Sequence, residues 1–142
     1  MIEITLVKEL KGKELVKDFE KIYGSIDKLK RVFERGDGNV KLELDLEDWE
    51  YFLKHPDEEL RETRLIYTEN PEITMKDVNL MGYIKNQKPQ SIKELADLAG
   101  RDISTIQRKV NLLEKEGFIE IKNGNKNSKI PVFNYDKLEI AI

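Results

Sequence analysis

Five side chains that carry a cation or a hydroxyl group fall within nine consecutive residues of the C-terminal half. They are Arg101, Ser104, Thr105, Arg108 and Lys109. A guanidinium group can form two hydrogen bonds to a guanine edge, and hydroxyl groups can bond phosphate oxygens or base edges. These groups therefore suit a nucleic acid, with Arg108 as the candidate for guanine and Arg101 for a phosphate.

Apolar residues at helical spacing run between these groups and predict a helix over residues 102–116. The apolar row is Ile103, Ile106, Val110 and Leu113. On a helical wheel this row faces the core and leaves the hydroxyl and cationic side chains on the outer face. Asp102 is a favourable N-cap residue for this helix, and Gly117 closes it.

A shorter helix precedes this one. Ser91 and Glu94 have the spacing of a capping box at its start, and Gly100 stands where a helix ends. Two short amphipathic helices joined by a tight glycine turn are typical of a helix-turn-helix. A further helix is predicted over residues 75–85, where apolar residues again recur at helical spacing.

After Gly117 the sequence predicts a β-hairpin. A strand over residues 118–121 is followed by a polar loop at 123–128 and a returning strand at 129–135. Polar and cationic side chains gather near the loop, and residues 122–129 include no Asp or Glu. They are Lys122, Asn125, Lys126 and Lys129. We expect them to contact a nucleic-acid backbone or a minor groove.

The segment SIKELADLAGRDISTIQRKVNLLEKEGFIEI resembles the helix-turn-helix and first wing strand of MarR-like winged-helix regulators. With IPVFNYDKLEIAI after it, the chain is also similar to a family of predicted archaeal and bacterial transcriptional regulators, some of them antitoxin-like. The resemblance covers residues 74–142 and, more weakly, 40–70. It implies sequence-specific binding of double-stranded DNA, usually as a dimer, with a recognition helix at 102–116 and a wing at 119–135.

The N-terminal half contains a stripe of apolar residues with spacings of three and four. The stripe is Leu15, Phe19, Ile22, Ile26, Leu29 and Phe33. This is the pattern of a helix–helix seam, interrupted at Gly24-Ser25, where it can divide into two helices. The seam suits packing within the chain and packing against a second copy equally well. Leu112, on the outer side of the 102–116 helix, is a candidate for the same packing.

Other N-terminal segments give local signals. Residues 2–7 predict a short strand, and the apolar–polar alternation of residues 40–46 after the turn at 36–39 predicts another. An amphipathic segment with Trp49 follows, and residues 55–59 have the composition of a short helix start. We place the domain boundary at Asn70-Pro71.

Composition argues against catalysis. The chain has no cysteine and one histidine, His55, so disulfides and thiolate sites are excluded and a histidine-based triad is disfavoured. The glycines at 36–38 lack the remainder of a phosphate-binding loop. We therefore expect no catalytic residue, no metal site and no cofactor.

Charge is divided unequally along the chain. Residues 1–70 hold 13 Lys and Arg against 18 Asp and Glu, whereas residues 71–142 hold 12 against 10. Such asymmetry is expected when one part of a protein meets a polyanion and the other does not.

The sequence as a whole predicts an α+β protein. Residues 71–142 would form a winged helix-turn-helix DNA-binding domain, and residues 1–70 an α/β dimerisation or accessory region. We expect a homodimeric, cytoplasmic regulator that is not in a membrane, because no apolar run approaches the roughly 20 residues of a span. The alternative is a winged-helix module that binds a protein partner, as an adaptor or an antitoxin, without specific DNA binding.

Overall fold

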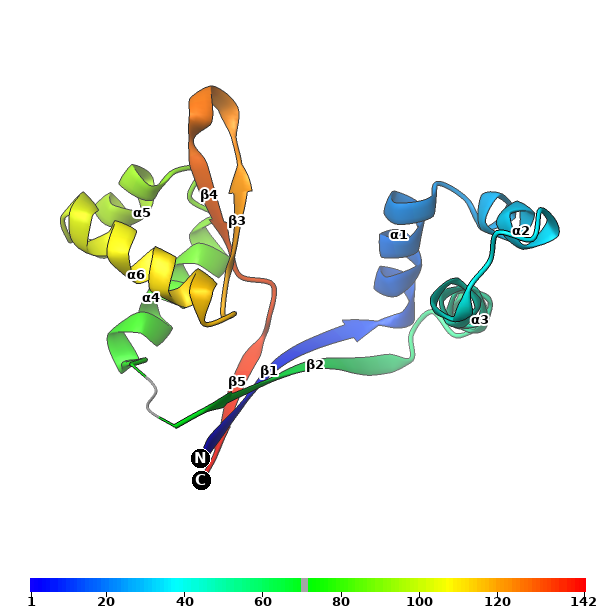
Figure 1. Ribbon diagram of the computed structural model, residues 1–142, viewed down its shortest axis with the longest axis horizontal. Helices are drawn as coiled ribbons and strands as arrows, with labels where there is room; N and C mark the ends of the chain where they lie inside the picture. Colours follow the sequence, from blue (N-terminus) through cyan, green and yellow to red (C-terminus); the bar gives the residue numbers. More distant parts are fainter. Residues whose placement is uncertain (70–71) are drawn as a thin grey trace. The chain divides into compact units, whose positions relative to one another are not determined.

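The computed structural model describes residues 1–69 and 72–142, and in this part the chain is a mixed α+β fold. The elements follow in the order β1 (Ile2–Lys11), α1 (Gly12–Tyr23), α2 (Ile26–Glu34), α3 (Val40–Lys54), β2 (Glu59–Thr68), α4 (Met75–Gln87), α5 (Ile92–Ala99), α6 (Ile103–Lys115), β3 (Glu120–Asn123), β4 (Lys129–Val132) and β5 (Lys137–Ala141) (Figure 1). No helix among the described residues combines the length and apolar character that a bilayer crossing requires.

The chain divides into two compact units. Unit 1 comprises residues 1–8 and 63–142, and unit 2 comprises residues 9–62. Unit 2 is thus an insertion that the chain enters along β1 and leaves along β2. The predicted division at residue 70 differs from this arrangement, because the start of β1 packs with the C-terminal half. The predicted boundary residues themselves lie outside the described part of the chain.

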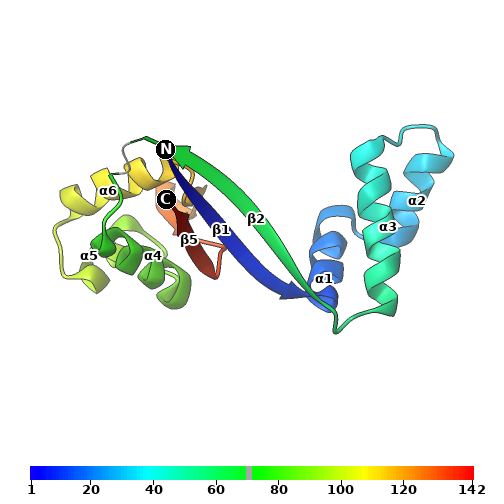
Figure 2. The same ribbon diagram turned by 90° about the horizontal axis from the view of Figure 1, so that it is seen from below.

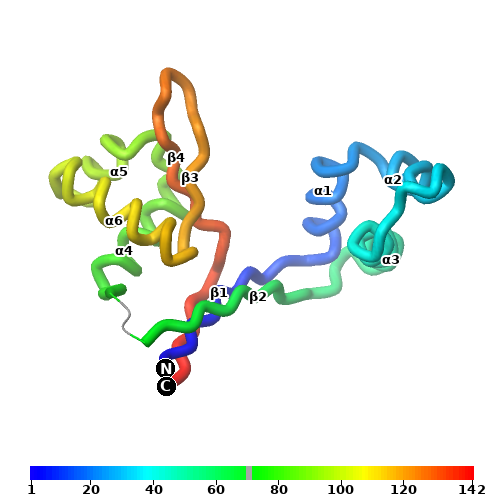
Figure 3. Tube along the Cα trace, in the orientation of Figure 1, coloured from blue at the N-terminus to red at the C-terminus, as the bar shows by residue number. Residues whose placement is uncertain are grey.

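Unit 1 holds a three-stranded sheet in the order β2-β1-β5. Strands β1 and β5 are antiparallel, with Ile4 opposite Ile140 and Leu6 opposite Leu138. The two ends of the chain therefore lie side by side (Figure 3). The predicted strand at residues 2–7 is confirmed and extends to Lys11.

Helices α4, α5 and α6 and the antiparallel β3–β4 hairpin complete unit 1. One apolar core joins these helices to Ile4 and Leu6 of β1. The buried side chains are Ile4, Leu6, Leu80, Met81, Ile84, Ile92, Leu95, Ala96, Ile106, Val110, Leu113, Phe118 and Ile119. This core fixes α6 along its inner face, so the opposite face is the one available for binding.

Unit 2 is built from α1, α2 and α3 around a second core (Figure 2). The apolar stripe at residues 15–33 is split between α1 and α2 at Gly24-Ser25, and Ser25 accepts a hydrogen bond from Lys28 N at 3.2 Å. Leu15, Phe19 and Leu29 are buried, with Ile26 and Phe33 packed beside them. They surround Trp49, whose ring stacks on Phe19 at 5.6 Å. The seam is thus filled within the chain, except for Ile22, which is 67% exposed.

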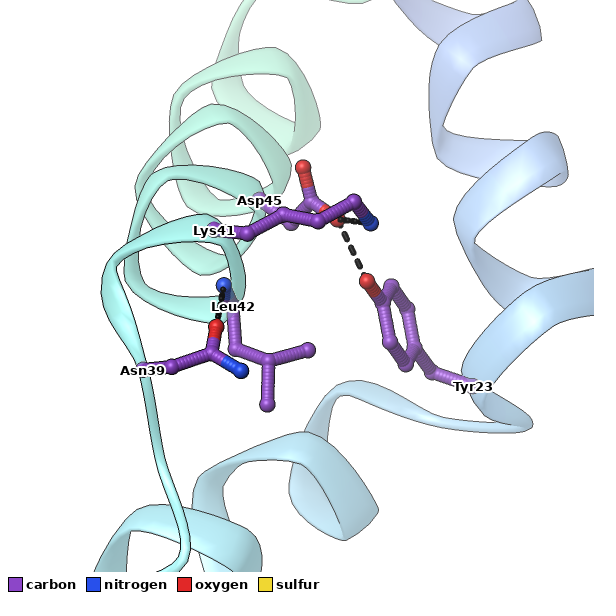
Figure 4. A network of polar contacts seen from close by, with 5 residues as sticks. All are labelled: Tyr23, Asn39, Lys41, Leu42 and Asp45. Carbon is purple, nitrogen blue, oxygen red and sulfur yellow. Dashed lines mark hydrogen bonds and ion pairs between the residues drawn. The ribbon is translucent and has the colours of Figure 1, made fainter.

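A polar network joins α1 to the first turns of α3 (Figure 4). The Tyr23 hydroxyl donates to Asp45 Oδ2, and Lys41 Nζ lies 3.3 Å from the same oxygen. Hydrogen bonding to Asp45 raises the pKa of Tyr23, because it stabilises the protonated phenol. Asn39 Oδ1 accepts a hydrogen bond from Leu42 N at 2.9 Å and caps α3.

The prediction of a strand at residues 40–46 is wrong, since these residues begin α3. An alternating run also contains pairs of residues four apart, and such pairs share one face of a helix. Leu42 and Leu46 form the pair that packs into the core of unit 2, whereas Val40 and Leu44 are exposed. The Asn39 cap stabilises the start of this helix.

The prediction of a helix at residues 55–59 is also wrong. Residues 55–58 form a turn, and β2 begins at Glu59. The carbonyl groups of Pro56 and Glu58 accept hydrogen bonds from Lys13 N at 2.8 Å and Gly12 N at 2.9 Å. These bonds to the start of α1 replace the local bonds that a helix would need.

Candidate nucleic-acid interface

Three capping residues determine where α5 begins and ends and where α6 begins, and so define the turn between the two helices. Ser91 accepts a hydrogen bond from Glu94 N at 3.0 Å at the start of α5. Gly100 ends that helix with φ +66°, a left-handed conformation that glycine adopts without steric cost. Asp102 then accepts a hydrogen bond from Thr105 N at 3.2 Å and starts α6. The predicted N-caps Ser91 and Asp102 and the predicted helix at 102–116 are confirmed. The predicted capping box is only half formed, because Glu94 Oε2 accepts a hydrogen bond from Gln90 N at 3.1 Å rather than from Ser91 N.

The inner face of α6 is shorter than predicted. Ile106, Val110 and Leu113 are each at most 2% exposed, whereas Ile103 is 49% exposed. The prediction that Ile103 faces the core is therefore wrong. Ile103 is the first residue of α6, and helical side chains lean toward the N-terminus, so it lies beyond the end of the buried row.

Asp102 organises the hydroxyl groups at the start of α6. Ser104 Oγ donates to Asp102 Oδ2 at 2.5 Å, and Thr105 Oγ1 donates to Asp102 Oδ1 at 2.7 Å. These hydrogen bonds, with that from Ser104 the largest cause, lower the pKa of Asp102 from 3.8 to about 2. Both hydroxyl hydrogens are thus engaged within the protein, and only oxygen lone pairs remain for another molecule.

Lys109 is held by a buried acid. Its Nζ atom lies 3.4 Å from Oδ2 of Asp77, a residue of α4 that is 0% exposed. The same Asp77 oxygen accepts a hydrogen bond from Thr74 N at 2.9 Å. A buried carboxylate requires a compensating cation, so Lys109 ties α6 to α4. The expectation that Lys109 points outward with the other candidate DNA-binding side chains does not agree with this contact.

The two arginines of the candidate site are placed differently. Arg108 is exposed and makes no ion pair within residues 1–69 and 72–142. It lines a shallow depression of about 290 Å³ on α6 together with Thr105, Lys109 and Leu112. Arg101 is half-buried in the α5–α6 turn, where its backbone N–H donates to Ala96 O at 3.1 Å.

The predicted hairpin is present as β3 and β4, with Asn123 opposite Lys129. Lys122, Asn125, Lys126 and Lys129 are all exposed. Lys129 Nζ donates a hydrogen bond to Asn123 Oδ1 at 2.8 Å, so one of its three N–H donors is used within the hairpin. Lys126 and Asn127 have φ values of +55° and +61°, a left-handed conformation that is uncommon for lysine. The returning strand ends at Val132, three residues before the predicted end.

Leu112 lies half-buried on α6. Besides the depression beside Arg108, it lines a small pocket with Ile66 and Thr68 of β2 and with Asp77. The N-terminal half of the sequence thus supplies part of the lining around Leu112 through β2.

The structure therefore gathers Ser104, Thr105 and Arg108 on the outer side of α6, with Arg101 in the preceding turn. Sequence reasoning missed the roles of two acids, Asp77 and Asp102, as binding partners of the predicted site residues. The signal for Asp77 was present, because it shares the apolar face of α4 with Leu80 and Ile84. An acid at such a position requires a partner.

Residues 72–140 are similar to the HVO_A0114 family, a range that runs from the approach to α4 into β5. The whole of unit 2 lies outside it. No curated protein and no solved structure matches the chain.

Proposed function

We propose that this chain is a sequence-specific transcriptional regulator that binds double-stranded DNA. In this proposal α4, α5, α6 and the β3–β4 hairpin form a winged helix-turn-helix, with α6 in the major groove. One observation carries it: Ser104 and Arg108 are exposed opposite the buried face of α6, with the half-buried Thr105 at its flank, on an element held by the core of unit 1. Polar groups on a rigid helix are what groove recognition requires.

Each group on α6 suits a particular contact. The unpaired guanidinium of Arg108 fits the O6 and N7 acceptors of guanine. Because Ser104 and Thr105 donate their hydrogens to Asp102, their oxygens would accept hydrogen bonds from the amino groups of adenine or cytosine. The Asp102 carboxylate disfavours phosphate at the Ser104 and Thr105 hydroxyl groups that it binds. In this proposal the phosphate contacts would therefore come from the Arg101 guanidinium and from the hairpin.

The hairpin and the distribution of charge support the same assignment. Lys122, Asn125 and Lys126 are exposed and face no acid in the hairpin loop. Unit 1 holds 14 Lys and Arg against 12 Asp and Glu, whereas unit 2 holds 11 against 16. A polyanion would therefore meet unit 1 rather than unit 2.

The assembly and the location are part of the proposal. We infer a cytoplasmic homodimer that reads two half-sites about one helical turn apart, roughly 34–36 Å. The second candidate function is a winged-helix module that binds a protein without specific DNA binding. The net negative charge of unit 2 is the observation that favours it.

Selection of bound duplexes from a random-sequence pool tests the proposal. An enriched sequence is expected, and Arg108→Ala should lower discrimination at one base pair by about 5- to 150-fold, which corresponds to roughly 1–3 kcal/mol. Arg31→Ala, which removes an exposed arginine of unit 2, is the matched control and should change nothing. Recovery of no preferred sequence, or equal losses on selected and random DNA for Arg108→Ala, would favour the protein-binding module.

A further inference from the structure

Helix α3 exposes a row of apolar side chains on the face turned away from its own core. Val40, Leu44 and Tyr51 are 71%, 54% and 45% exposed. Their spacings of four and seven residues place them along one side of the helix, opposite the buried Trp49. Helices α1 and α2 both pack on the Trp49 side. We call the row Val40, Leu44 and Tyr51 the α3 stripe.

Tyr51 is fixed in place although it is exposed. Its ring stacks on His55 with 4.2 Å between ring centroids and makes a T-shaped contact with Phe52 with 5.0 Å between centroids. Its hydroxyl donates to Glu58 at 2.6 Å. An aromatic side chain that is already immobile loses little conformational entropy when another molecule covers it. Tyr51 thus has the properties of a binding anchor.

Glutamates follow one edge of the stripe. Glu43, Glu47 and Glu50 are spaced by four and three residues, and all are exposed. Glu50 is paired with Lys30 at 3.5 Å, whereas Glu43 and Glu47 make no ion pair within the described ranges 1–69 and 72–142. Like charges four residues apart destabilise a helix. A cation supplied by another molecule would remove this repulsion.

The charge of these glutamates also determines which kind of surface can bind to the α3 stripe. In a symmetric pair of identical subunits with antiparallel α3 helices, the same edge of both helices meets and the two rows of glutamates would approach each other. Juxtaposed like charges oppose binding. A second copy is therefore a poor occupant, and a surface of opposite charge is a good one.

We propose that the α3 stripe is a docking surface for a partner protein that presents a basic amphipathic helix. The stripe spans about 16 Å, or three helical turns. A fitting helix would carry apolar residues toward Leu44 and Tyr51, and Lys or Arg toward Glu43 and Glu47. This role goes beyond the proposed DNA binding and does not depend on it, since the stripe belongs to unit 2.

The test uses the full chain and two synthetic probes. One is a labelled helical peptide of four turns with an apolar stripe bordered by lysines, and the other has glutamate at every lysine position. Fluorescence anisotropy at low salt should show that the basic peptide binds at least about tenfold more tightly than the acidic one. Raising the salt should weaken that binding.

Two pairs of variants localise the site. Leu44→Ser should weaken binding of the basic peptide by about tenfold. Leu53→Ser should leave binding unchanged, because Leu53 is 51% exposed on α3 but lies on the opposite side from Leu44. Glu47→Lys should weaken binding more than Glu20→Lys, which makes the same charge change on α1. All four positions are exposed, and circular dichroism would check that each variant is folded.

Three results would overturn the proposal. The first is equal affinity for the basic and acidic peptides. The second is an equal effect of Leu44→Ser and Leu53→Ser. The third is a dimer in sedimentation experiments that Leu44→Ser, but not Leu53→Ser, converts to monomer, because the occupant would then be a second copy of the chain.

Discussion

Lys109 Nζ lies 3.4 Å from Asp77 Oδ2, and this contact links α6, which carries the candidate interface, to α4. Asp77 is fully buried, and its Oδ1 atom has no hydrogen-bond partner in the described part of the chain. The side chain of Lys109 is 27% exposed. The two partners are thus unequally placed, because the lysine can reach water when the contact breaks and the acid cannot.

This inequality predicts unequal effects of mutation. Lys109→Met should lower the free energy of unfolding by about 3 kcal/mol, because it leaves a buried carboxylate without its cation. Adding Asp77→Leu to Lys109→Met should recover part of that loss, because it removes the buried charge but also the acceptor of the Thr74 N–H group. Lys115→Met, at an exposed lysine of the same helix, should change stability by less than about 0.5 kcal/mol. Urea unfolding measures all three, and a double variant less stable than Lys109→Met would contradict this account.

The lowered pKa of Asp102 predicts that the stability of the fold depends on pH in the acid range. The folded state favours the ionised carboxylate, so its contribution is complete above the ordinary value of 3.8 and is lost as pH falls through about 2. Asp102→Asn keeps an acceptor for Thr105 N–H but cannot titrate. It should therefore flatten the decline of the melting temperature in this range of pH.

Direct titration checks the cause. The Asp102 carboxyl should titrate near 2 when it is followed by NMR, and Ser104→Ala should raise this pKa, because it removes the hydrogen bond that lowers it most. A wild-type Asp102 that titrates near 3.8 would contradict the hydrogen-bonded arrangement.

The two separate cores predict separate effects on unfolding. Leu29 and Leu80 are buried in unit 2 and unit 1, and Trp49, the only tryptophan, lies in unit 2. Leu29→Ala should lower the free energy of unfolding of unit 2, followed by tryptophan fluorescence, by about 2–5 kcal/mol. Leu80→Ala should leave the midpoint of that transition in place and shift only a probe of unit 1. Equal shifts of fluorescence in both variants would mean that the units unfold together.

Two substitutions of Lys126 can distinguish the effect of backbone strain from the effect of charge at the tip of the hairpin. With φ +55°, this lysine is strained, and glycine adopts the same conformation freely. Lys126→Gly should stabilise the chain by about 0.5–1 kcal/mol, whereas Lys126→Ala should not. If the hairpin contacts DNA, both variants should reduce the slope of log affinity against log salt by about 1. Unequal slopes would show that the backbone conformation, not the charge, mediates the contact.

Local signals were enough to predict the part of unit 1 that carries the candidate site. The caps Ser91 and Asp102, the turn at Gly100 and the apolar row of α6 act over a few residues, so the helices at 92–99 and 103–115 could be predicted from their own sequence. The same holds for the hairpin. The surroundings of Lys109 could not be predicted in this way, because its partner Asp77 is 32 residues away on another helix.

In the N-terminal half, the sequence determined the apolar stripe and its break at Gly24-Ser25, and both are present as α1 and α2. Tertiary structure decided the rest. The alternating run at residues 40–46 was compatible with either a strand or a helix, and packing of Leu42 and Leu46 around Trp49 selected the helix. Pairing of β1 with β5, at opposite ends of the chain, placed the first eight residues in unit 1. Such contacts depend on side chains that meet only after folding, and no local pattern encodes them.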